Sequence, residues 1–108
     1  MDIQSRFKKQ LNKLIDDEKE FEYFREIAKK YMMSKPYFVK NMLDDLMFFS
    51  LENNLRKITA WTSYYLGWYF INILEFDKAV KSFFMSNDIF EEIGDKEGLI
   101  YACNGLSN

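Results

Sequence analysis

Residues 61–86 read WTSYYLGWYFINILEFDKAVKSFFMS, and the spacing of apolar side chains in this stretch decides the fold. Leu66 and Phe70 lie one helical turn apart, and Ala79 and Phe83 repeat that spacing further along the chain. Apolar residues that recur every three or four positions indicate amphipathic helices, whereas strands alternate at every second position. The stretch therefore predicts two helices that pack against each other as an antiparallel hairpin.

A glycine inside the first of these helices indicates that the two helices pack closely. Gly67 directly follows Leu66, and a glycine in a helix interior is less favourable than alanine by about 1 kcal/mol. We infer that Gly67 has a packing role, because the missing side chain lets the second helix approach. The small residue Ala79 is expected to face it, and Phe83 to fill the space one turn further on.

Helical spacing continues through the rest of the chain and is interrupted only by short turn signals. Pro36 suits the first turn of a helix, where its missing N–H is not needed. Gly94 suits a left-handed helix end, and Asp95 can open the helix that follows. The acidic run at 16–20 either ends the first helix or lies on the exposed face of a longer one. The chain is thus predicted to be all-α, with about five or six helices whose short connections make neighbours antiparallel.

An ordered set of these residues carries a resemblance to a known repeat. The set consists of Leu66, Gly67, Phe70, Phe76, Ala79, Phe83 and Ser86, and we expect its members to pack between the two helices. It resembles one tetratricopeptide repeat (TPR), which places Leu-Gly and an aromatic residue on the first helix and Ala, Phe and a small residue on the second. Similar pairs recur as Ile27-Ala28 and as Leu106-Ser107, 39 residues before and 40 residues after Leu66-Gly67.

The resemblance implies antiparallel helical hairpins stacked as a short TPR-like superhelix, and the alternative is a generic helical bundle. It divides the chain into an N-terminal helix at 1–20, a degenerate repeat at 21–59, the best-matching repeat at 60–99, and at 100–108 the start of a further repeat or a capping helix. The offset exceeds the usual TPR period of about 34 residues. Ser63 also stands where the family has tryptophan.

A second stripe on the long helix lies apart from the hairpin contact. It holds Trp61, Tyr64, Trp68 and Asn72, at steps of three, four and four. The matching positions are Glu22, Arg25, Lys29 and Met33 on the preceding helix, and Tyr101, Asn104 and Asn108 on the following one. In TPR folds such a stripe resembles the wall of a concave groove that receives a peptide or protein. The alternative is that Trp61 and Trp68 are core residues packed beneath the N-terminal helix.

The composition argues against catalysis and against several kinds of ligand. The chain has no histidine and one cysteine, Cys103, so it lacks the commonest general base and the usual metal-ligand sets. The net charge is −2, and the basic residues do not form a cluster. The chain therefore lacks the concentrated positive charge that binds the phosphates of nucleic acid. The most apolar run, 64–74, is shorter than the roughly 20 residues that span a membrane. We expect no enzymatic activity, no cofactor or metal, and a reducing cytoplasm as the compartment.

The function implied by the resemblance is non-enzymatic recognition of a protein or peptide. Long-period TPR domains occur in bacterial signalling proteins, so we expect a regulatory module that forms the N-terminal part of a larger protein of this kind. The partner's apolar segment would be buried on the aromatic stripe, with Arg25, Lys29 and Asn72 orienting it. Two alternatives are a small-molecule-sensing helical domain and a structural unit that forms a homodimer through the C-terminal helix.

Overall fold

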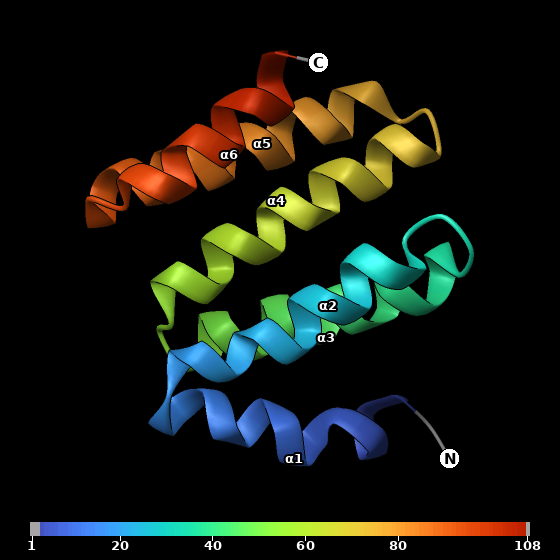
Figure 1. Cartoon of the computed structure of the whole chain (residues 1–108), viewed down its shortest axis with the longest axis vertical. Helices are drawn as coiled ribbons and strands as arrows, with labels where there is room; N and C mark the ends of the chain where they lie inside the picture. Colours follow the sequence, from blue (N-terminus) through green and yellow to red (C-terminus); the bar gives the residue numbers. More distant parts are fainter. Residues whose placement is uncertain (1–2, 108) are drawn as a thin grey trace.

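Six α-helices and one short 3-10 helix make up the computed structural model, which describes residues 3–107 (Figure 1). Residues 1, 2 and 108 lie outside the described part, and side chains are described from residue 7 to residue 106. The elements are α1 (Ile3–Asp16), η1 (Glu18–Phe21), α2 (Glu22–Tyr31), α3 (Pro36–Glu52), α4 (Arg56–Asn72), α5 (Phe76–Ile93) and α6 (Lys96–Ser107). The all-α prediction is confirmed, with six helices at the upper end of the predicted number.

Helices that follow one another in the chain pack against one another, with α4 in the centre. α4 packs on α3 and most extensively on α5, while α6 packs on both α5 and α4. In Figure 1, α6 overlies α5 and α2 overlies α3, and α4 runs between the two pairs. α1 lies at the opposite end from α6 and packs on α3 and η1. The predicted antiparallel packing of successive helices is therefore confirmed.

The helix boundaries repeat along the chain with a constant offset. α3 begins at Pro36 and α5 at Phe76, and α4 begins at Arg56 and α6 at Lys96, an offset of 40 residues in both cases. This value is close to the offset that the sequence pairs indicate. The starts of α3 and α4 are thus repeated at α5 and α6, whereas α2 is shorter than α4, at 10 residues against 17.

This offset identifies second-helix positions that the sequence pattern leaves without clear matches in the degenerate repeat. Val39 in α3 stands 40 residues before Ala79, and Leu43 stands 40 residues before Phe83. All four side chains are buried. Aliphatic residues therefore occupy in α3 the places that alanine and phenylalanine occupy in α5.

The turns lie at the predicted positions, and the acidic run at 16–20 ends the first helix. α1 ends at Asp16. Asp17 has an extended backbone, and its side-chain carboxylate accepts a hydrogen bond of 2.9 Å from the Lys19 N–H. Gly94 ends α5 with φ of 72°. Asp95 then accepts a 3.0 Å hydrogen bond from the Gly98 N–H at the start of α6. Side-chain capping therefore begins a new element at each of these two aspartates.

The ring of Phe83 lies in the space left by two glycines. A Cβ atom added at Gly67 in α4 would lie 2.6 Å from Phe83 Cε1, and one added at Gly105 in α6 would lie 2.5 Å from the same atom. Phe83 is 1% exposed, so its ring is held between the two helices and has no free side toward which to move. The predicted packing role of Gly67 is confirmed, and the Phe83 ring lies directly at the place that a Cβ of residue 67 would take.

Most other residues of the set that resembles a TPR are buried or half-buried, and Phe76 is exposed. Leu66, Ala79 and Ser86 are buried, and the Ser86 hydroxyl donates a 2.8 Å hydrogen bond to the Ala60 carbonyl of α4. Phe70 is half-buried. Phe76 is 58% exposed, so the prediction that it packs between the helices is wrong. Phe76 is the first residue of α5, ahead of the turn at which the buried face of that helix begins.

We expect Gly67→Ala to destabilise the fold although alanine is the better helix former. The methyl group would meet a ring that Gly105 confines from the other side, so the free energy of unfolding should fall by about 1–3 kcal/mol. Denaturant unfolding followed by circular dichroism measures this change. The double variant Gly67→Ala/Phe83→Leu should lose less than the sum of its single variants, because the smaller side chain leaves room for the methyl group. A stabilised Gly67→Ala protein would contradict the close contact.

Candidate binding groove

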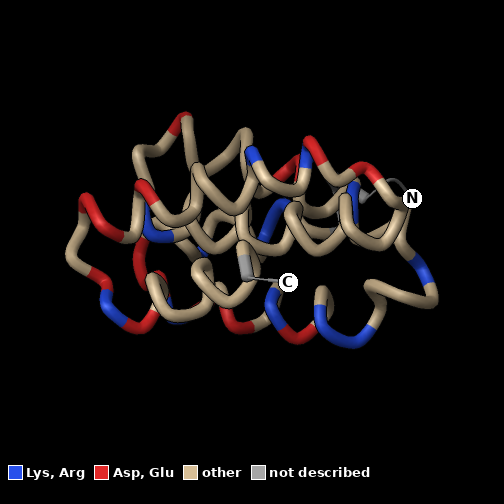
Figure 2. The backbone as a smooth tube through the Cα atoms, turned by 90° about the horizontal axis from the view of Figure 1, so that it is seen from above, with Lys and Arg blue, Asp and Glu red and all other residues tan. Residues whose placement is uncertain are grey.

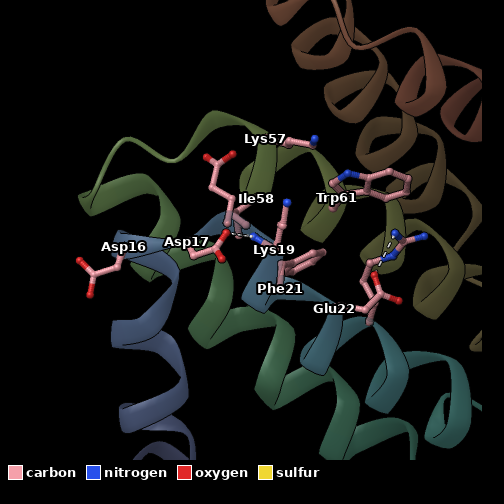
Figure 3. Close-up of a pocket in the computed structure, with 10 residues that line it drawn as sticks. Asp16, Asp17, Lys19, Phe21, Glu22, Lys57, Ile58 and Trp61 are labelled. Atoms are coloured by element: carbon pink, nitrogen blue, oxygen red, sulfur yellow. Dashed lines mark hydrogen bonds and ion pairs between the residues drawn. The ribbon is translucent and has the colours of Figure 1, made fainter.

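Two adjoining hollows lie between the elements η1 and α2 on one side and α4 on the other. We call them the charged hollow and the apolar hollow, and together the α2–α4 groove. The charged hollow of about 440 Å³ is lined by Asp16, Asp17, Glu18, Lys19, Phe21, Glu22, Arg25, Lys57, Ile58 and Trp61 (Figure 3). The apolar hollow of about 540 Å³ is lined by Ala28, Met32, Met33, Tyr65, Trp68, Ile71 and Asn72.

Arg25 connects α2 to α4 at the point where the two hollows adjoin. Its Nε donates a 3.0 Å hydrogen bond to Tyr65 Oη, and its guanidinium lies 4.3 Å from the centre of the Trp61 ring. Nη1 is 3.4 Å from the Glu22 carboxylate. A planar guanidinium suits this combination, because it can stack on a ring and donate hydrogen bonds from its edge at the same time. Arg25 thus lines the charged hollow while Tyr65, which it contacts, lines the apolar one.

The environment of this contact changes the acidity of both groups. Burial disfavours the charged form of Arg25, but the hydrogen bond to Tyr65 and the nearby Glu22 carboxylate outweigh it, so the pKa of Arg25 is raised. Burial also raises the pKa of the Tyr65 phenol, and the hydrogen bond from Arg25 offsets only part of that rise. At neutral pH the contact therefore joins a cation to a neutral phenol.

The charged hollow is rimmed by side chains of both signs over an aromatic base. Figure 3 shows Lys57 and Trp61 on one side, opposite Phe21 and Glu22, with Asp16 directed away from the hollow. Four carboxylates and three cationic side chains line it. Arg25 is paired with Glu22, and Lys57 Nζ is 3.9 Å from the Asp95 carboxylate. The hollow can therefore contact polar or charged groups of a ligand, and its net charge is slightly negative.

The apolar hollow has the chemistry of a site for a large hydrophobic side chain. Trp68 is half-buried, with its ring packed edge-on against Phe83 at a centroid distance of 5.5 Å. Met33 is 78% exposed at the edge of the hollow. The polar side-chain groups of the lining residues are the Tyr65 hydroxyl, the Trp68 indole N–H and the Asn72 amide. Ligand sites are commonly of this kind, mostly apolar with a few placed polar groups.

Trp61 is mainly a core residue, which corrects its expected place in an open stripe. It is 5% exposed, and its ring contacts Phe90 at 5.0 Å and Tyr101 at 5.3 Å between centroids. The guanidinium of Arg25 also lies over this ring. Tyr64 joins the same cluster through Tyr101, at 5.9 Å. The predicted aromatic stripe therefore links α4 to α6 through Trp61 and Tyr64. It borders the charged hollow at Trp61 and the apolar hollow at Trp68 and Asn72.

The remaining predicted groove residues lie outside both hollows. Lys29 has a half-exposed side chain with Nζ 3.9 Å from the Glu26 carboxylate, and Asn104 is exposed on α6. The N-terminal helix does not fill the groove, because Phe7 of α1 packs against Phe24 and Phe38 instead. The alternative in which Trp61 and Trp68 pack beneath that helix is therefore wrong, although Trp61 is buried by other elements.

Four residues of the apolar hollow were not among the predicted groove positions. They are Ala28, Met32, Tyr65 and Ile71. The repeat offset could have identified two of them, because Met32 stands 40 residues before Asn72 and Tyr65 stands 40 residues after Arg25. Ala28 belongs to the recurring pair Ile27-Ala28, but that pair indicates helix packing and not a groove position. Ile71 carries no signal beyond ordinary helical spacing.

The charged residues do not gather into a patch of one sign. Basic and acidic residues are interspersed along the chain trace (Figure 2). Within residues 3–107, no helix has the length and apolar character of a membrane span, and no group of three or more potential ligand side chains is placed to hold a metal ion. Comparisons with protein-family models, curated proteins and solved structures found no match to this chain.

We expect the stability of the wild-type protein to fall at alkaline pH partly through Tyr65. Its folded-state pKa is raised, so the unfolded chain loses this proton first, and stability present below about pH 10 is lost as the pH rises further. Tyr65→Phe should make that fall shallower, although it should also cost about 1 kcal/mol at neutral pH by removing the hydrogen bond. Urea unfolding at pH values on both sides of 10 measures the slope.

The matched control for this measurement is Tyr37→Phe, which alters a phenol that is 73% exposed. This variant should retain the wild-type dependence on pH. Equal slopes for wild type and Tyr65→Phe would show that the Tyr65 phenol is not held neutral by its surroundings.

Proposed function

We propose that this chain is a non-enzymatic, TPR-like module that binds a segment of a protein or peptide in the α2–α4 groove. The observation that carries the proposal is the apolar hollow beside Trp68, which adjoins a charged hollow across the Arg25–Tyr65 contact. An apolar anchor with polar groups beside it is the usual arrangement of peptide-binding surfaces.

Side-chain contacts at the repeat offset support the TPR-like interpretation. Arg25 contacts Tyr65, and Trp61 contacts Tyr101, each pair being 40 residues apart. The first contact joins α2 to α4 and the second joins α4 to α6. Equivalent positions of successive first helices thus lie next to each other, as stacking of repeated hairpins requires. In such a stack the first helices share one face, and the α2–α4 groove lies between two of them.

The spacing of the groove constrains the ligand that we propose. Trp61 in the charged hollow and Trp68 in the apolar hollow are seven residues apart, or about 10 Å along α4 at 1.5 Å per residue. An extended peptide covers that distance in about three residues, and a helical ligand in about two turns. The ligand should therefore carry a large apolar side chain for the apolar hollow and, one such interval away, a polar or charged side chain.

The cellular role rests on the family resemblance. We propose a regulatory module within a cytoplasmic bacterial signalling protein, in which occupation of the groove controls the attached activity. The small-molecule alternative retains one supporting observation, because the apolar hollow has a volume in the range that small ligands occupy.

A displayed library of random peptides tests the proposed recognition. Selected peptides should carry a large apolar residue, and a labelled copy should bind the wild-type protein in fluorescence anisotropy. Met33→Glu should weaken that binding at least about tenfold, because it places a charge at the edge of the apolar hollow. Met33 is largely exposed, so the variant should fold normally.

Phe48→Glu is the matched control, because it changes a side chain that is 65% exposed on α3 and lines neither hollow. It should leave peptide affinity unchanged. Selected peptides that bind wild type and Met33→Glu equally would contradict the proposed site. Failure to select any peptide, together with binding of anilinonaphthalene sulfonate to wild type but not to Met33→Glu, would favour the small-molecule alternative.

A further inference from the structure

The outer face of α5 carries a third hollow that is separate from the α2–α4 groove. It has a volume of about 460 Å³ and lies where α5 meets Arg56 at the start of α4. Phe84 and Met85 contribute apolar surface to it and are 53% and 38% exposed. Exposed aromatic and methionine side chains are characteristic of the centres of protein interfaces. This face therefore offers an apolar centre for a contact.

Two oppositely charged side chains flank that apolar centre. Lys81 and Asp88 also line the hollow, and both are exposed. They are seven residues apart, so they lie on the same side of α5 with about 10 Å between them along its axis. In the part of the chain that the structure describes, neither side chain has an ion-pair partner, whereas Arg56 and Glu92 beside them pair with each other.

This arrangement is complementary to itself. Lys81 and Asp88 lie equally far on either side of the midpoint between Phe84 and Met85. If two copies of α5 run antiparallel with their midpoints together, Lys81 of each copy faces Asp88 of the other, and the apolar residues meet in the middle. A two-fold contact needs this property, because the same patch must serve both subunits.

We propose that two copies of this chain associate through the outer faces of their α5 helices, with reciprocal Lys81–Asp88 ion pairs around an apolar centre formed by Phe84 and Met85. The patch is small, and exposed ion pairs contribute little each, so the dimer forms in a concentration-dependent manner. The α2–α4 groove shares no lining residue with this face and remains accessible in the dimer.

Analytical ultracentrifugation over a wide concentration series tests the dimer and its geometry. Wild type should dimerise at high concentration. Lys81→Glu and Asp88→Lys should each weaken dimerisation at least about tenfold, because each places two like charges opposite each other in both halves of the contact. The double variant Lys81→Glu/Asp88→Lys should restore dimerisation, since the pairs re-form with reversed signs. Circular dichroism confirms that each variant is folded.

Two further variants distinguish this interface from one formed by α6. Lys96→Glu reverses an exposed charge on α6 and should leave dimerisation unchanged. Ile100→Glu alters a side chain that is 63% exposed on α6 and should also have no effect. A protein that is monomeric at every concentration would overturn the proposal. Loss of the dimer in Ile100→Glu would also overturn it. A double variant Lys81→Glu/Asp88→Lys that dimerises no better than its single variants would overturn it as well. None of these results bears on peptide binding in the groove.

Discussion

The ring of Phe83 between two glycines is the contact on which the arrangement of the central helices depends. Gly67 in α4 and Gly105 in α6 both leave room for this one side chain of α5, and no atom larger than hydrogen fits there on either side. The ring therefore determines how closely three helices approach one another. Close packing of this kind specifies a single arrangement, because neither a larger nor a smaller side chain fills the space equally well.

The α2–α4 groove exists because this close contact is not repeated around α2. The recurring pair Ile27-Ala28 puts alanine at the place of Gly67, and the 40-residue offset of the helix starts puts Ile27 there. By either alignment, α2 has a side chain where α4 has a glycine. α2 packs on α3 much less extensively than α4 packs on α5. Long side chains make contacts between α2 and α4, chiefly Arg25 with Tyr65 and Trp61. The charged hollow and the apolar hollow lie on either side of these contacts.

Much of the fold could be predicted from local signals, and much less of the candidate site. The spacing of Leu66, Gly67 and Phe83 predicted the central hairpin, and Gly94 and Asp95 predicted the junction of α5 and α6. Phe76 was assigned to the packed set because it fits the motif, but the structure exposes it at the start of α5. A match to the motif does not show whether the helical turn that carries the residue is in contact with a neighbouring helix.

By itself, the sequence determined that the chain is helical and where its turns lie, because these properties depend on short-range spacing and backbone preference. Only the tertiary structure decided which aromatic residues are buried. Trp61 and Trp68 occupy equivalent places on one stripe of α4, and each borders a hollow. Arg25, Phe90 and Tyr101 bury Trp61 almost completely, whereas Trp68 is only half-buried. Burial depends on side chains from other helices that meet α4 only in the folded molecule.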